Sequence, residues 1–132
     1  MSRLILIIAF PIFVFSQDTD IRKSESYANG QFVYEDFCML CHMANGKGVP
    51  KAFPPLANSD YLEDIKATIN SIKYGLNGPI VVNGVKYNGV MTPMGLDDQE
   101  VADVTNFILN TWGNKYDKLI TKQMVEKLTA KQ

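Results

Sequence analysis

The chain has 132 residues, of which 46% are hydrophobic and 20% are charged, and its formal net charge is −1. This length fits one domain, and this composition excludes a disordered or collagen-like chain. The near-neutral charge provides no broad basic surface, so we expect no nucleic-acid partner.

The first sixteen residues have the layout of a secretory signal peptide. A short start containing Arg3 is followed by the uncharged run 4–15, and Ser16 offers a cleavage point. The run is shorter than the ~20 residues that span a bilayer. We therefore predict an exported, periplasmic protein with no membrane span in the mature chain, or a membrane-associated one if the segment stays uncleaved. Residues 17–26 are polar and lack apolar periodicity, which indicates a flexible leader.

A first helix is predicted over residues 27–41. Gly30, Tyr34 and Cys38 recur at every fourth position and therefore share one face of that helix. Residues 44–56 are rich in glycine and proline, which is typical of a loop.

A second helix is predicted over residues 60–74, with Asp60 as its N-cap and Gly75 ending it. Residues 80–87 then have the pattern of a short β-hairpin. Its centre is Asn83-Gly84, a pair that supplies the positive φ angles of a two-residue type I′ turn.

The clearest helix signal covers residues 97–112. Asp97 is a good N-cap and Glu100 stands three residues later, which is a capping-box arrangement. Gly113 is well placed to end this helix. The remaining residues, 115–132, are more polar and have the pattern of a weakly amphipathic helix.

Residues 38–42 read Cys-Met-Leu-Cys-His, a C-x-x-C-H run that attaches haem. Cys38 and Cys41 can form thioethers with the two vinyl groups on one porphyrin edge, and His42 can then bind the iron. Zinc would need four ligands where this run offers three, and a thioredoxin-like dithiol site expects a βαβ pattern that is absent. We therefore predict one covalently attached haem c, with His42 as an iron ligand.

The second iron ligand should be a methionine, because His42 is the only histidine and a thioether suits electron transfer. Met39 lies inside the attachment run and Met43 directly follows it, so neither can readily reach the opposite face of the haem. Met124 lies in the polar tail. Met91 and Met94 remain, in a stretch with Gly and Pro that is predicted to be a loop, and spacing alone leaves both open.

Several short motifs follow one another in a characteristic order. They are Gly30-x-x-Val33-Tyr34, Cys38-x-x-Cys41-His42, Gly46-x-Gly48, Phe53-Pro54-Pro55-Leu56, Tyr87-Asn88-Gly89-Val90-Met91, the run 96–104, and Trp112-Gly113-Asn114. In this order the chain resembles the class I cytochrome c family, specifically its small bacterial monohaem members.

This resemblance implies an all-α cytochrome c fold, with three to five helices around one covalently bound haem and a small β-hairpin near residues 80–87. The domain would cover residues 27–114. Its first and last helices would cross at Gly30, beside an aromatic contact for which Tyr34 and Phe107 are candidates.

The resemblance also implies roles in the site. Pro54, with Pro55 as the alternative, would accept a hydrogen bond from Nδ1–H of His42, and Met91 rather than Met94 would be the sixth ligand of the iron. The implied function is one-electron transfer, without enzyme activity, between redox protein partners that stay unidentified.

Several alternatives remain open at this point, and one of them is a dithiol oxidoreductase without haem. A labile sixth ligand would make the protein a haem enzyme or a sensor of peroxide or gas. The protein could instead be a subunit of a larger oxidoreductase rather than a free monomer, with residues 115–132 as a docking element. The apolar residues near Met39, Met43 and Val49 could form a docking face, or could pack against the haem.

Overall fold

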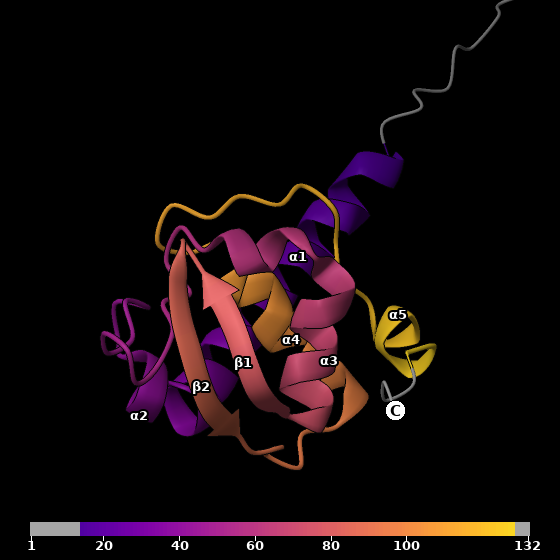
Figure 1. The fold of residues 1–132 in the computed structure, drawn as a ribbon. Helices are drawn as coiled ribbons and strands as arrows, with labels where there is room; N and C mark the ends of the chain where they lie inside the picture. Colours follow the sequence, from indigo (N-terminus) through magenta and orange to yellow (C-terminus); the bar gives the residue numbers. More distant parts are fainter. Residues whose placement is uncertain (1–13, 129–132) are drawn as a thin grey trace, which may run out of the picture.

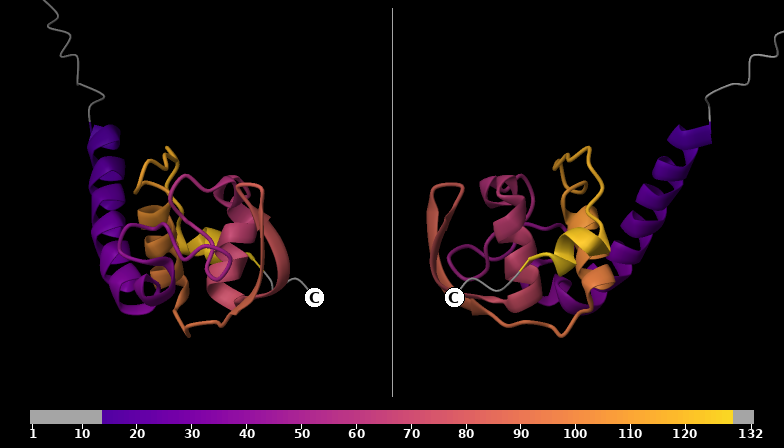
Figure 2. Two further views of the ribbon diagram at one scale, coloured as in Figure 1. Left: turned by 60° about the vertical axis from the view of Figure 1, so that its left-hand side comes forward. Right: turned by 90° about the vertical axis from the view of Figure 1, so that its right-hand side faces the viewer.

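The computed structural model describes residues 14–128, so most of the predicted signal segment, 1–16, lies outside the described residues. The elements in chain order are α1 (Val14–Phe37), α2 (Met39–His42), the 3₁₀ turn η1 (Asp60–Glu63), α3 (Ile65–Tyr74), β1 (Leu76–Val82), β2 (Val85–Met91), α4 (Asp98–Ile108) and α5 (Lys122–Glu126). The views agree that the hairpin forms one side and α1 the other, with α3 and α4 between them (Figures 1 and 2). Helices thus dominate, as the all-α fold class predicts. None of those in the described range is long and apolar enough to cross a membrane.

Helices α1 and α4 cross at Gly30, as predicted. A Cβ atom there would overlap the carbonyl oxygen of Asp103 and lie 2.9 Å from Cβ of Phe107. Tyr34 packs beside the crossing, with ring centroids 5.4 Å from Phe107 and 4.9 Å from Trp112. The glycine therefore lets two backbones approach closely, and the aromatic rings fill the adjoining space.

Helix α1 includes residues 17–26, so the expectation of a flexible leader there is wrong. Ser26 is buried, donates to the carboxylate of Asp103 and accepts from the amide of Asn106, both on α4. Lys23 donates to two backbone carbonyls of the C-terminal segment. Polar partners order this part of α1, and an apolar pattern cannot reveal such partners.

The predicted helix over 60–74 is interrupted near its start. The carboxylate of Asp60 accepts from the backbone N–H of Asn83 at 2.7 Å, in the turn of the hairpin. Asp64 is the N-cap of α3 instead, and accepts from the N–H of Ala67 at 2.9 Å. Because Asp60 binds the hairpin, a 3₁₀ turn precedes the α-helix.

The hairpin is longer than the predicted residues 80–87. Its strands pair in antiparallel register from Val82↔Val85 at the turn to Leu76↔Met91 at the open end. Asn83 and Gly84 have φ angles of 49° and 77°, as a type I′ turn requires. The extra length places Met91 on a paired strand instead of in the predicted loop.

The capping box of α4 is present as predicted, with Asp97 and Glu100 each bonded to the other's backbone N–H. The helix ends at Ile108 instead of Trp112. The side-chain amide of Asn114 donates to the carbonyl of Ile108 at 2.9 Å, which satisfies a group that a further turn would otherwise use.

The C-terminal segment packs on the core. Ile120 is 1% exposed, and Val125 of α5 is fully buried. The side chain of Asn106 bonds both backbone groups of Ile120, at 2.8 and 2.9 Å. Lys73 donates to the carbonyl of Val125 and pairs with a carboxylate of α4 at 2.7 Å. The segment therefore stabilises the fold.

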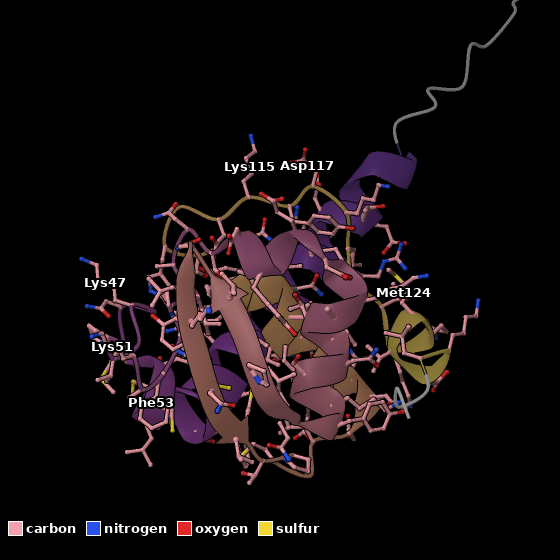
Figure 3. All side chains as sticks on the ribbon, in the orientation of Figure 1. Lys47, Lys51, Phe53, Lys115, Asp117 and Met124 are labelled. Carbon is pink, nitrogen blue, oxygen red and sulfur yellow. The ribbon has the colours of Figure 1, made fainter. Side chains whose placement is uncertain are left out.

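We expect Ile120→Ala to lower the free energy of unfolding by about 2 to 5 kcal/mol, because it leaves a cavity in a closed part of the core. Met124→Ala is the matched control, since Met124, labelled beside α5 in Figure 3, is 39% exposed. Its effect should stay within about 0.5 kcal/mol. Chemical denaturation of the haem-loaded protein measures both. Equal losses would show that the segment is not packed as described.

Candidate haem site

The C-x-x-C-H run forms the short helix α2, which begins directly after α1. The backbone hydrogen bonds continue from α1 into α2. The N–H of Cys38 donates to the carbonyl of Tyr34, and the N–H of His42 donates to the carbonyl of Cys38 at 3.0 Å. Met43 then turns away with a φ angle of 64°. One helical turn therefore carries both thiols and the imidazole, so the three groups can face the same space.

That space is a cavity of about 150 Å³. Its walls include all five residues that sequence reasoning assigned to the site, namely Cys38, Cys41, His42, Pro54 and Met91. A second cavity of about 60 Å³ adjoins it and also has Cys38, His42 and Met91 in its walls. Most of the remaining lining is apolar, and includes Ile72, Leu76, Ile80, Val82 and Ile108.

His42 is held in a form that can bind a metal. Its Nδ1 lies 3.0 Å from the carbonyl oxygen of Pro54, and because a carbonyl only accepts, Nδ1 carries the hydrogen. Burial lowers the pKa of His42, and the bond to Pro54 opposes that shift in part. The neutral ring therefore has a free lone pair on Nε2, and the Pro54 bond fixes the ring's orientation.

The loop between α2 and η1 brings Pro54 to His42. Gly48 donates to the carbonyl of His42 at 3.0 Å, and Leu56 donates to the carbonyl of Gly46 at 2.7 Å. Gly48 has a φ angle of 60°, and a Cβ atom there would overlap the carbonyl of Phe53. A side chain at this position would therefore push the backbone at Gly48 away from the backbone of Phe53 and Pro54.

Met91 is the last residue of β2, and its backbone is held from two sides. It pairs with Leu76 on β1. Gly75 precedes that strand with a φ angle of 77°, and a Cβ atom there would overlap the carbonyl of Met91 and lie 2.9 Å from Cδ of Pro93. Met94 also lines the cavity but is 38% exposed and follows in an irregular segment. Sequence reasoning took Gly75 only as a helix stop and missed this contact.

The thiol of Cys38 differs from the nucleophilic thiol of a dithiol redox site. Both cysteines are free. Burial, and then the nearby Cys41, raise the pKa of Cys38 to about 12. Redox cysteines depend on a lowered pKa, so this environment argues against dithiol chemistry. Nor does the structure, over residues 14–128, place three or more His, Cys, Asp or Glu side chains where they could hold a metal ion, as tetrahedral zinc requires.

The residues present fit a haem. The walls offer two thiols from one helical turn, an imidazole with a free Nε2, a thioether, and an apolar lining for the faces of the ring. One hydroxyl in the second cavity, that of Ser59, is buried and has no hydrogen-bond partner.

Comparison with known proteins agrees with this site. The family model described as Cytochrome c matches residues 27–112. The chain is 42% identical over 117 residues to cytochrome c-552 of Thermus thermophilus, covering 80% of this chain and 87% of that protein.

The chain is also similar to subunits of larger assemblies. It is 35% identical over 104 residues to the cytochrome c subunit of an alcohol dehydrogenase (quinone) from Gluconacetobacter polyoxogenes, covering 75% of this chain and 22% of that subunit. It is 31% identical over 123 residues to the gluconate 2-dehydrogenase cytochrome c subunit of Pantoea cypripedii, covering 87% of this chain and 28% of that subunit. Each of these subunits is therefore several times longer than the part that this chain matches.

Proposed function

Because this chain belongs to the cytochrome c family and is an electron carrier with a covalently attached haem c, we propose that Cys38 and Cys41 hold the haem and that His42 and Met91 are its axial ligands. One observation supports this assignment: the side chains of these four residues, at α2 and at the end of β2, line the same cavity.

The haem supplies one-electron oxidation and reduction of its iron. The chain's own residues fix how this happens. Pro54 orients the imidazole of His42 and increases its donor strength. The thioether of Met91 would be the second protein ligand of the iron, which would raise the potential and leave no open site for peroxide or a gas. The apolar walls exclude water from the iron.

We propose that partners dock at the apolar rim of the larger cavity. Six large apolar side chains are exposed on or beside it: Phe37, Met39, Leu40, Phe53, Val90 and Met94. Leu40 is 87% exposed. In Figure 3, Lys47 and Lys51 project from the same edge of the molecule as Phe53. A small apolar patch with two lysines at one edge suits brief contact with a redox protein that has acidic residues at the matching edge.

We also propose a cellular location and a class of partner for this protein. The signal-peptide pattern of residues 1–16 supports export to the periplasm. The similarity to dehydrogenase subunits supports a redox enzyme as one partner, which the chain would serve as a free carrier or as a bound subunit.

The ligand assignment is tested by comparing Met91→Ala with Met94→Ala. We expect Met91→Ala to lose the sulfur–iron charge-transfer band of the oxidised protein, to lower the reduction potential, and to let carbon monoxide bind the reduced protein at neutral pH. Met94→Ala should keep the band and the resistance to carbon monoxide. Optical spectra and a redox titration of both variants beside wild type provide the measurement. Loss of the band in Met94→Ala alone would make Met94 the ligand.

A further inference from the structure

The hydroxyl of Ser59 is buried and unpartnered. Ser59 stands at the N-cap position of η1, yet its side chain makes no capping hydrogen bond. It is 8% exposed, and its Oγ has no partner. Among the described residues one other buried side-chain atom lacks a partner, Oδ1 of Asn70, which is outside the walls of both cavities. A buried hydroxyl without a partner is destabilising and calls for an explanation.

Ser59 lies in the wall of the smaller cavity, where the other hydroxyl groups already have partners. Ser71 donates to the carbonyl of Ala67 at 2.8 Å, and Tyr61 bonds Ser71 at 2.9 Å. Thr68 donates to the carbonyl of Tyr61. Ser59 is therefore the one hydroxyl lining this cavity whose hydrogen is free to bond to something inside it.

Neither cavity has a lysine or an arginine in its walls. Ser59 also lines a separate surface groove, whose charged residues are Asp60, Glu63 and Lys115. A haem brings two propionate carboxylates, and a carboxylate taken out of water needs hydrogen-bond donors. In the absence of a cation on the walls, neutral donors must supply those bonds.

We infer that Ser59 donates its hydroxyl hydrogen to a propionate of the haem, an inference that rests on the proposed haem site. The bond would give the buried hydroxyl a partner and would stabilise the carboxylate where no basic side chain reaches it. Ser59 would thereby favour one orientation of the haem edge and would stabilise reduced iron, because a bonded carboxylate presents less negative charge to it.

The test compares Ser59→Ala and Ser59→Thr with wild type by resonance Raman spectroscopy of the haem-loaded protein. In wild type, the propionate bending band should shift when the protein is transferred into D₂O, because the donated hydrogen exchanges. Ser59→Ala should change this band, remove its D₂O shift and lower the reduction potential. Ser59→Thr keeps the hydroxyl and should retain both the band and the shift.

The possible failures can be told apart. If Ser59→Ala keeps covalent haem and the sulfur–iron band but leaves the propionate band and its D₂O shift unchanged, the inference is wrong and the hydroxyl bonds only to water. A loss of the D₂O shift in Ser59→Thr as well would also contradict it, since the donor is still present. If wild type shows no haem stain after denaturing electrophoresis, the proposed function fails and the inference fails with it.

Discussion

Gly30→Val should lower the free energy of unfolding by about 3 kcal/mol or more, a large part of the stability of a domain of this size. The added side chain would overlap the carbonyl oxygen of Asp103, which is backbone and cannot rotate away. The helices cannot separate without cost, because Ser26 of α1 is bonded to Asp103 and Asn106 of α4. The variant should therefore accumulate poorly as haem-loaded protein.

Gln31→Val is the matched control for this substitution. It adds the same side chain one position later on α1, where Gln31 is exposed and bonds only Glu35 on its own helix. Its effect should stay within about 0.5 kcal/mol, the usual range for a surface substitution. The yield of haem-stained protein and the midpoint of denaturant unfolding measure both variants. Similar midpoints for the two would mean that α1 and α4 do not cross at Gly30.

Gly75→Ala should remove or weaken the sulfur–iron charge-transfer band while leaving the haem covalently attached. A methyl group at position 75 would overlap the carbonyl of Met91 and lie within 3.0 Å of the Pro93 ring. The end of β2 must then move, and the thioether moves with it. The attachment run on α2 is on a different element, so Cys38 and Cys41 are unaffected.

The control separates this contact from backbone strain. Gly84 has the same φ angle of 77°, but a Cβ atom there has no neighbour within 4 Å. Gly84→Ala should therefore carry only the cost of the positive φ angle, without the overlap, and should keep the band. The oxidised spectrum and the reduction potential of the two variants give the answer. A normal band in Gly75→Ala would show that Met91 is not positioned through Gly75, or that it is not the ligand.

Local patterns predicted the parts of the molecule that depend on neighbouring residues. The run from Cys38 to His42 forms one helical turn, held by backbone hydrogen bonds between residues three or four positions apart. The capping box of Asp97 and Glu100 and the turn at Asn83 likewise depend on residues a few positions apart.

Other features depend on partners far along the chain, and the sequence does not name such partners. Asp60 and Asp64 both look like helix caps, and only the nearby hairpin turn decides between them. Ser26 sits in a polar stretch that is helical because α4 bonds to it. The role of Gly75 depends on its contact with Met91 and Pro93, and that of Ser59 on the cavity that it lines; neither follows from neighbouring residues in the sequence.

The contact between the two ends of the chain bears on the order in which the protein is made. Ser26 meets Asp103 across 77 positions, and Lys23 meets the backbone of Tyr116 across 93. Closing loops of this length is entropically costly and slows folding. Helix α1 therefore lacks its partner until nearly the whole chain has been synthesised. We therefore expect that haem can attach to Cys38 and Cys41 before α1 docks on α4 and closes the fold.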